Sequence, residues 1–447
     1  IQAACYALLL RERGVAADAG TLLYTKNAAV ERGEASGDLS PAKEFSVGKG
    51  LLEFVVRQRN EIAATEYDVS VPTGYEADAK CEYCFEQDTC MVVSGRLDQE
   101  SKAGQIGTAL PHEEREYFEA TYRALEEERR KTHAEYRKLW EQTAEERAAA
   151  DRALIDLEPV AEEPLGDGRW RLTARKTSDA VSKLREGDVA LASDGDPASG
   201  HAELGRIQKL DDEVVVETDE PVQLHRLDVY PSELSVSRMH TAVHDFVLKG
   251  DPDRKDVLFG RREPAFADGE TAFIDNNAAQ NAAVNRAVNA EDFALVHGPP
   301  GTGKTYTIAR IVRALAERGN RVLLSAFTNR AVDNALEALR EQGFTDALRV
   351  GTETGVRGDM QDLRLVTRGE PNDRAAKLNS ATVVAATTSS CGSRTMREQA
   401  FDVALVDEAS QLTEPGTLAA VTLADRFVLV GDHEQLPPVV RAENRLQ

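Results

Sequence analysis

The sequence predicts an α/β protein whose C-terminal half forms a parallel, doubly wound sheet. From Phe273 onward five short apolar runs, FALVHG, RVLLSAF, ATVVAAT, DVALVDE and RFVLVGD, are separated by segments of helical length. Short apolar strands that alternate with helices are typical of parallel sheets with helices on both faces. A glycine-rich loop, GPPGTGKT, directly follows the first run and precedes a helical pattern. The remaining elements are predicted upstream of this sheet.

Composition limits the classes that the chain can belong to. Its 447 residues predict several domains, and 41% hydrophobic with 29% charged residues suits a globular protein. No apolar run approaches the roughly 20 residues that span a bilayer, so we expect no membrane association. Five cysteines in such a long chain do not make a secreted disulfide framework, which favours a reducing, cytoplasmic compartment.

The net charge of −23 is unusual for a protein that binds nucleic acid, because phosphate contacts come from Lys and Arg. Acidic residues are spread over the whole chain, and Arg is commoner than Lys. This is the surface of a protein that works in high salt, where a Debye length of about 3 Å at 1 M weakens repulsion of a polyanion. The alternative is an ordinary acidic protein that never meets nucleic acid.

Upstream of the parallel sheet the pattern changes several times. A long run rich in Glu, Arg, Ala and Leu without Gly or Pro predicts a helical stalk, which we expect to be a hairpin of two long helices. Short β-type runs between Gly, Asp and Pro turns then predict a small β-barrel. The predicted elements are a helix at 1–14, a strand at 20–24, a helix at 47–65, the stalk at 112–157, the barrel strands at 170–222 and a mostly helical segment at 231–266. The predicted domains are 1–110, 111–160, 161–230 and 231–447.

The loop at 298–305 is a complete phosphate-binding pattern in the right setting, between a strand and a helix. Its glycines let backbone N–H groups face phosphates, and the helix N-terminus favours an anion. Lys304 is expected to reach the β- and γ-phosphates of ATP, and Thr305 to place its hydroxyl on Mg²⁺. The loop residues predicted to bind the nucleotide are Gly298, Pro299, Pro300, Gly301, Thr302, Gly303, Lys304 and Thr305.

Polar residues after other apolar runs complete a predicted hydrolytic site. Asp407 ends the strand VALV and can hold Mg²⁺, while Glu408 can orient the attacking water. Gln435, in GDHEQLPP, is placed to sense the γ-phosphate. Gln280, upstream of the loop, can bond an adenine edge, although an exposed helix residue is the simpler interpretation. The Asp-Glu pair alone is also common as an acidic turn at a strand end.

Taken in order, GPPGTGKT, SAFTNRAVDNAL, DEASQ and GDHEQLPP resemble the first motor domain of superfamily 1 helicases. The branch is the one that contains RNA-decay helicases and replication helicase–nucleases, which also carry a stalk and a barrel before the motor. The resemblance covers about 112–447 and implies a RecA-like P-loop domain. It implies that Thr328 and Asn329 contact single-stranded nucleic acid, and that Ser389 and Ser390 lie near a second contact.

The first helix and the cysteines favour the helicase–nuclease branch. Gln2 and Tyr6 lie four residues apart, and with the following GTLLY they resemble the last motif of RecB-like nucleases. Cys81, Cys84 and Cys90 then resemble the segment that binds a 4Fe-4S cluster in that family. The resemblance places the fourth cysteine and the nuclease's metal-binding carboxylates before Ile1, so the chain is expected to be a piece truncated at both ends.

Zinc is the alternative metal, because C-x-x-C also suits zinc. Cys5 is a rival fourth ligand, but it lies inside the Gln2–Tyr6 helix, off the family position. Cys391 is expected to be a packed thiol. His240 and His244 share a helix face but lack an HExxH carboxylate, so they are read as surface or packing residues.

The resemblance therefore implies an ATP-dependent DNA helicase–nuclease of haloarchaeal type, associated with the nucleoid and with replication or repair proteins. It implies 5′ to 3′ movement on single-stranded DNA and trimming of flaps or ends. Motor catalysis needs both lobes, so this piece is expected to bind ATP but to hydrolyse it poorly. An RNA-directed helicase with a zinc module, and a nucleotide-gated scaffold without motor activity, remain alternatives.

Overall fold

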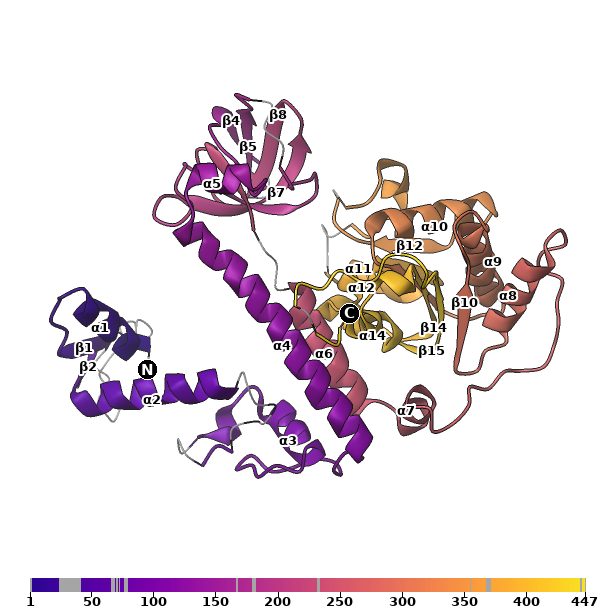
Figure 1. The fold of residues 1–447 in the computed structure, drawn as a ribbon, viewed down its shortest axis with the longest axis horizontal. Coiled ribbons are helices and arrows are strands. Elements are labelled where there is room, and N and C mark those ends of the chain that lie inside the picture. The colour runs from indigo at the N-terminus through magenta and orange to yellow at the C-terminus, as the bar shows by residue number, and fades with distance from the viewer. Residues whose placement is uncertain are drawn as a thin grey trace, which may run out of the picture. The chain divides into compact units, whose positions relative to one another are not determined.

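The computed structural model describes residues 2–23, 42–65, 69, 71, 73–75, 79–165, 168–178, 182–230, 234–353, 355–366, 371–442 and 444–446. The chain divides into two compact units, Ile1–Ala109 and Leu110–Gln447, whose elements are labelled in Figure 1. None of the helices within the described part of the chain has the length and apolar character that crossing a membrane requires.

The first unit is a small set of helices and one strand pair. The predicted helix at 1–14 is confirmed from Gln2 on, and Gly14 follows its end with a φ of +77°, a value that glycine adopts without strain. The predicted strand at 20–24 is confirmed up to Leu23, since Tyr24 lies outside the described residues. The elements are α1 (Gln2–Glu12), β1 (Ala19–Leu23), β2 (Ala42–Ser46), α2 (Lys49–Thr65), η2 (Cys81–Tyr83) and α3 (Gln87–Arg96), with β1 and β2 antiparallel.

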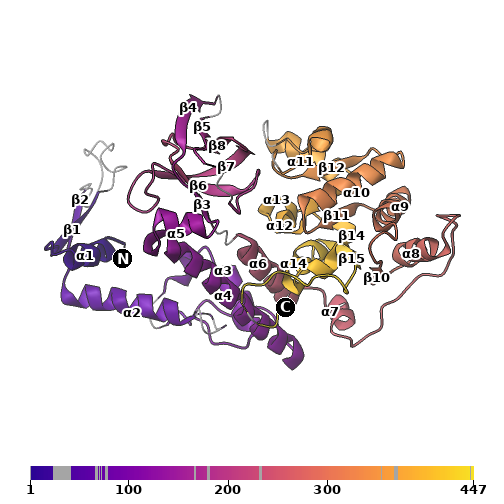
Figure 2. The same cartoon turned by 45° about the horizontal axis from the view of Figure 1, so that its top comes forward.

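The second unit begins with one long helix, α4 (His112–Glu141), and a short one, α5 (Ala144–Ala149). The predicted hairpin of two long helices is therefore wrong. Thr143 accepts a hydrogen bond from the Glu146 N–H and Glu146 bonds back to the Thr143 N–H, a capping box that starts a new helix after α4. The long partner of α4 is α6 (Leu234–Lys249), which comes from beyond the following sheet and lies beside α4 in both views (Figures 1 and 2).

Buried acidic residues fasten α4 to later parts of its unit. The carboxylate of Glu114 contacts the Lys255 ammonium at 2.6 Å, and both side chains are only 3% exposed. Glu128 accepts backbone N–H groups of Arg441 and Ala442 at 2.8 and 2.9 Å. A buried charge is tolerated when it is paired or hydrogen-bonded in this way. The acidic sequence of α4 predicts a helix surrounded by solvent, but some of its acidic residues are buried against later parts of the unit.

The β-rich segment forms an antiparallel sheet of seven strands in the order β3-β9-β6-β7-β8-β5-β4. It starts at Ala153, earlier than the expected barrel. Its described residues show no pairing between the end strands β3 and β4, so closure into a barrel stays a prediction. The strands are β3 (Ala153–Leu154), β4 (Glu158–Pro164), β5 (Trp170–Arg175), β6 (Val189–Ser193), β7 (Ala202–Leu210), β8 (Glu213–Thr218) and β9 (Arg226–Val229).

The C-terminal part of the unit contains the predicted parallel sheet, with strand order β10-β15-β14-β11-β13-β12. All its pairings are parallel, which confirms the predicted α/β class. The five strands seen in the sequence are present, and the short edge strand β12 adds a sixth. The strands are β10 (Phe293–His297), β11 (Val322–Ala326), β12 (Ala347–Val350), β13 (Val383–Thr387), β14 (Phe401–Asp407) and β15 (Ala424–Gly431).

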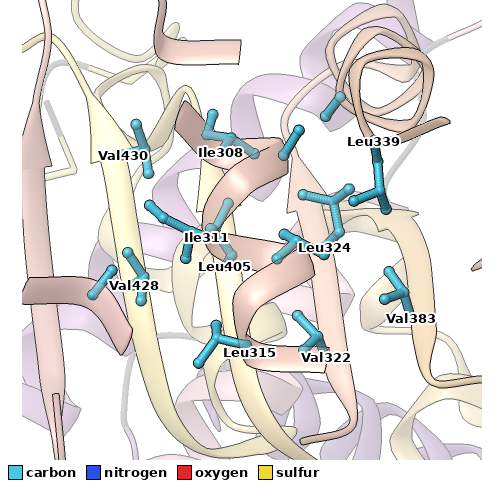
Figure 3. Packing of buried hydrophobic residues seen from close by; sticks show 14 of the residues in the cluster. Ile308, Ile311, Leu315, Val322, Leu324, Leu339, Val383, Leu405, Val428 and Val430 are labelled. Atoms are coloured by element: carbon cyan, nitrogen blue, oxygen red, sulfur yellow. The ribbon is translucent and has the colours of Figure 1, made fainter. Parts of the chain in front are cut away.

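Helices cover both faces of this sheet. On one face α8, α9 and α10 share a core with the strands, and Figure 3 shows Ile308, Ile311 and Leu315 of α9 beside Leu324, Leu405 and Val428 of the strands. On the other face α14 packs against β14, β15 and α6. Each fully buried Leu or Ile contributes about 1.5–3 kcal/mol. The helices are α7 (Pro252–Leu258), α8 (Ala278–Val288), α9 (Lys304–Glu317), α10 (Asn329–Glu341), η3 (Gly358–Leu363), α11 (Pro371–Ser380), α12 (Thr388–Cys391), α13 (Arg394–Arg397), η4 (Ala409–Gln411) and α14 (Glu414–Val421).

Candidate functional site

The predicted motifs meet along the carboxyl edge of the parallel sheet. His297, the last residue of β10, is paired with Gly431 at the end of β15. Ala326, the last residue of β11, lies between Asp407 of β14 and Thr387 of β13. Because parallel strands end at one edge, segments that are far apart in the sequence come together there. Ligands of open parallel sheets bind at this edge.

The loop 298–305 connects β10 to α9 and has the backbone of a phosphate cradle. Gly301 and Gly303 have φ angles of +77° and +80°, which residues with a Cβ rarely adopt. A Cβ on Gly303 would lie 2.4 Å from the amide nitrogen of Gln280, so the close approach of that side chain also requires glycine. The loop leads into the N-terminus of α9, where free N–H groups favour an anion.

Lys304 lies half-buried at the first turn of α9 and points back across the loop. Its ammonium donates to the carbonyl oxygens of Gly298 at 2.6 Å and Pro299 at 3.4 Å. Thr305 beside it is exposed. A flexible lysine on carbonyl oxygens can move to phosphate oxygens, whose full charge makes the stronger hydrogen bond. The donor set, with glycines, lysine and a free hydroxyl, fits a triphosphate with Mg²⁺.

Gln280, in the first turn of α8, lies on the phosphate loop. Its amide nitrogen donates to the Thr302 carbonyl oxygen at 2.8 Å, and its own N–H is capped by the side chain of Asn277. Gln280 thus contacts the loop, and its bond to an adenine edge stays a prediction. In this arrangement the Gln280 side chain holds the loop; the proposed bond to an adenine edge would use its remaining oxygen.

Asp407 and Glu408 follow at the end of β14. Asp407 is 7% exposed, and burial raises its pKa to about 6, with the Glu408 charge adding to the rise and the Glu408 N–H and Lys304 opposing it. Glu408 has a φ of +54°, and its carboxylate accepts the Gln411 amide at 3.0 Å. Strain of this kind is often found at functional sites. A carboxyl ligates a divalent cation in its ionised form, so a cation that binds Asp407 has to displace this proton.

The segment 431–435 is bonded to both of the other motifs. The N–H of Gly298 donates to the Gly431 carbonyl at 3.1 Å, and the Asp432 N–H donates to the Ser410 hydroxyl at 3.2 Å. Asp432 accepts the Gln435 amide at 3.0 Å and lies 3.0 Å from the His297 ring nitrogen. These two contacts, the Gln435 bond first, lower the Asp432 pKa to about 2. Gln435 thus lies at the edge shared with the loop.

The residues predicted to contact nucleic acid lie after β11 and β13. Thr328 caps α10, its hydroxyl accepting the Ala331 N–H at 3.2 Å, and Asn329 is exposed. Ser389 lies in α12 and accepts the guanidinium of Arg238 on its hydroxyl at 3.0 Å. The hydroxyl of Ser390 lies 2.9 Å from that of Thr387. Both segments share the edge that carries the phosphate loop.

Sequence reasoning missed the residues that support these positions. His297 and Asp432 connect two motifs, yet neither residue type alone predicts that contact. Arg238 is one basic residue in a helix of mixed polarity, with nothing in its spacing to indicate Ser389 as a partner. The signal that could have found His297 and Asp432 is position, since both stand at strand ends that parallel topology brings together.

The three clustered cysteines are free thiols in the first unit. Cys84 is exposed, Cys81 and Cys90 are half-buried, and the Cys90 sulfur lies 3.8 Å from the Ser101 hydroxyl. Within the part of the chain that the structure describes, only His201, Glu203 and Glu220 hold three ligand atoms within 4.8 Å of one another. The sulfurs are of the right chemistry for a cluster, but they are not drawn into one ligand set.

The other residues considered in the sequence have ordinary surroundings. Gln2 donates to the Tyr6 hydroxyl at 2.9 Å, so the two residues do share a helix face. Cys391 is fully buried and burial raises its pKa to about 11, which confirms a packed thiol. His240 contacts the Glu126 carboxylate at 2.9 Å and the ring of Tyr122, which confirms a packing role.

The comparisons with known proteins match the part of the chain that contains these motifs. Residues 275–370 and 361–443 match the AAA_11 family model, described as an AAA domain. The chain is 40% identical over 169 residues to the DNA replication ATP-dependent helicase/nuclease DNA2 of Saccharomyces cerevisiae, covering 37% of this chain and 11% of the yeast protein. It is 39% identical over 228 residues to JHS1 of Arabidopsis thaliana, a protein of the same description, covering 48% of this chain and 17% of that protein.

A longer alignment reaches the first unit as well. The DNA2 protein of Bos taurus is 26% identical over 499 aligned positions, which cover 98% of this chain and 45% of the bovine protein. The chain thus spans less than half the length of these relatives. Among solved structures, an Arterivirus nonstructural protein 10 helicase with DNA aligns at a TM-score of 0.30 and 14% identity, covering 64% of this chain and 49% of that one. This likeness is too weak to carry an argument.

Proposed function

We propose that the chain is part of an ATP-dependent DNA helicase–nuclease that acts in DNA replication or repair. The observation that carries the proposal is the junction of three motifs at one sheet edge, where Gly298 bonds Gly431 and Asp432 bonds Ser410. Each motif alone has an ordinary structural explanation, whereas their hydrogen-bonded assembly around Lys304 and Asp407 fits nucleotide hydrolysis. The AAA_11 match over the same residues supports it.

The roles follow from the chemistry of the side chains. Lys304 and the loop amides bind the β- and γ-phosphates, and Thr305 and Asp407 hold Mg²⁺. Bound Mg²⁺ neutralises charge that develops on the phosphates during their transfer. Glu408, held by Gln411, orients the attacking water. Gln435 senses the γ-phosphate and passes its presence to the rest of the motor.

The nucleic acid lies across the same edge in this proposal, over Thr328, Asn329 and the Ser389–Ser390 turn. We infer DNA rather than RNA because the similar relatives are described as DNA replication proteins. Flaps and ends as substrates, and replication proteins as partners, belong to the same proposal. The net charge of −23 supports a protein adapted to high salt. A place close to the nucleoid belongs to the proposal because its substrate is DNA.

Binding of a fluorescent ATP analogue to this chain tests the motor proposal directly. Lys304→Ala should weaken binding at least about tenfold, because it removes a charge-assisted contact to phosphate. Lys209→Ala, which removes an exposed lysine of the antiparallel sheet, is the control and should bind as the parent does. Equal affinities for the parent chain and Lys304→Ala would refute a phosphate site here. Parallel titrations with oligo(dT) and oligo(rU) of one length separate the DNA and RNA alternatives.

For the first unit we propose that Cys81, Cys84 and Cys90 supply three ligands of an iron–sulfur cluster. Free, accessible thiols at C-x-x-C spacing support it, as does the helicase/nuclease description of the relative that covers this unit. Anaerobically purified protein should show a broad visible absorption band that Cys84→Ser removes, while Cys391→Ser, which changes a buried thiol elsewhere, retains it. One zinc per chain without colour would select the alternative metal.

A further inference from the structure

Arg349 lies in the edge strand β12 and has no exposed surface. Its Nε donates to a carboxylate oxygen of Asp333 in α10 at 2.8 Å, and one terminal nitrogen donates to the Val350 carbonyl at 2.7 Å. Asp333 is itself 1% exposed, and its second oxygen accepts the Arg357 N–H at 2.9 Å. A buried guanidinium is stable only when its donors are matched in this way. Arg349 is therefore fixed in position.

The other terminal nitrogen of Arg349 donates to the side-chain oxygen of Asn329 at 2.7 Å. A guanidinium can only donate hydrogen bonds, so this contact fixes which way the Asn329 amide faces. Its oxygen is turned to Arg349 and its NH₂ group to the other side. Among the residues that the structure describes, none accepts a hydrogen bond from that NH₂ group, and Asn329 is exposed.

Glycine keeps the space around this amide open. A Cβ on Gly355 would lie 3.0 Å from the Asn329 amide nitrogen, and one on Gly351 would lie 3.1 Å from a terminal nitrogen of Arg349. Side chains at these positions would push on the groups that hold the amide. The surroundings of Asn329 thus favour one orientation, with two N–H donors available at the sheet edge.

We propose that Arg349 is a positioning residue for nucleic-acid binding: it holds Asn329 as a fixed hydrogen-bond donor to a phosphate of single-stranded DNA. The inference rests on the proposed function and deepens it. A group that can only donate needs an acceptor, and the phosphate oxygen is the acceptor present at every nucleotide, so this contact reads no base. An oriented neutral amide can donate to a phosphate oxygen without carrying a charge itself.

Binding of a fluorescein-labelled oligo(dT) to the 447-residue chain, measured by anisotropy, tests this assignment. Asn329→Ala and Arg349→Lys should each raise the Kd by about tenfold, the size expected for one hydrogen bond to a charged group. The double variant should bind no more weakly than either single variant, because both remove the same contact. ATP-analogue binding should stay at the parent value in all three.

Two further variants distinguish loss of the proposed contact from a general loss of folding. Arg321→Lys changes an arginine with several carbonyl partners at the opposite end of β11, and it should leave oligo(dT) affinity unchanged. Asn329→Asp keeps an oxygen for Arg349 but replaces the donors with a carboxylate oxygen, so it should bind more weakly than Asn329→Ala. This second variant tests the donor assignment even if Arg349→Lys does not fold.

An oligonucleotide with uncharged methylphosphonate linkages identifies the contacted group. The parent chain should lose more affinity on this substitution than Arg349→Lys, since the variant no longer aims a donor at the phosphate. An equal loss, or an Asn329→Asp variant that binds as the parent does, overturns the inference while the motor proposal stands. Failure of the parent chain to bind oligo(dT) at all overturns the nucleic-acid proposal and this inference with it.

Discussion

Replacing Asp407 with Asn should stabilise the nucleotide-free, metal-free protein at neutral pH. Asp407 is 7% exposed at the end of β14, and burial raises the pKa of its carboxyl from 3.8 to about 6. The folded state therefore holds this proton more tightly than the unfolded state does. An Asn side chain resembles the protonated form and can still accept the Glu408 N–H.

The sign and size follow from this difference in pKa. Below pH 3.8 both states are protonated, and the carboxyl does not change the stability. As pH rises from 3.8 to about 6, only the unfolded state loses the proton, so the parent loses stability. At 1.36 kcal/mol for each pKa unit the full loss is about 3 kcal/mol above pH 7, and about half of it is present at pH 5. Asp407→Asn should remove this pH dependence.

Hydrogen exchange followed by mass spectrometry measures the effect locally. Peptides from β11 and β15, which flank β14 and keep their sequence, should exchange more slowly in Asp407→Asn than in the parent at pH 8, in EDTA and without nucleotide. The difference in exchange rate between Asp407→Asn and the parent should become smaller toward pH 5. Asp402→Asn, at the other end of β14, is the control and should destabilise, because it removes the carboxylate charge that favours the charged forms of Arg321 and Arg426. A difference in exchange rate between Asp407→Asn and the parent that does not change with pH would refute the reasoning. Faster exchange in Asp407→Asn than in the parent would refute it as well.

Two other changes test how α4 and the antiparallel sheet are held. Glu128→Ala removes the acceptor of two backbone N–H groups, so 441–446 should lose hydrogen-exchange protection worth about 2–4 kcal/mol, whereas Glu128→Gln should retain most of it. Asp228 is fully buried between Arg147 and Arg226, with oxygens 2.6 Å from each guanidinium. Asp228→Ala should destabilise the sheet by about 3–5 kcal/mol, which can be measured from Trp170 fluorescence on heating. An unchanged midpoint of thermal unfolding would contradict a structural role for the contacts of Asp228 with Arg147 and Arg226.

The fold could be predicted from the sequence where the local hydrophobic pattern of a segment also indicates its neighbours in the fold. The five apolar runs became strands of one parallel sheet, and β11, β13 and β14 are buried on both faces, which leaves a continuous hydrophobic signal. The edge strand β10 keeps an apolar sequence although its Leu295 is exposed. The edge strand β12 was missed, since ALRV is short and contains Arg349. The stalk was misjudged for a different reason: the partner of α4 comes from α6, and helix periodicity does not indicate which helix packs on which.

The motifs of the candidate site could be predicted from the sequence. The side chains that hydrogen-bond the motif residues could not. The loop 298–305, Asp407 and Gln435 stand directly after strands, so parallel topology alone predicts that they share an edge. The contact of Gln280 with the loop and the bond from Arg349 to Asn329 each join residues about 20 positions apart. Residue type does not indicate such pairings, because an arginine in a short strand is most often exposed to solvent.

Lys304 and Gln435 each hydrogen-bond a partner within the protein, and the two partners differ in charge. Lys304 rests on neutral carbonyl oxygens, which phosphate oxygens displace readily because they carry charge. Gln435 instead rests on Asp432, whose pKa of about 2 keeps it ionised, so a neutral acceptor cannot compete for that amide. Only a charged group brought close to Gln435 can draw it away. In the proposed function, nucleotide binding through the loop and release of Gln435 are therefore separate events, and we expect the second to depend on the terminal phosphate.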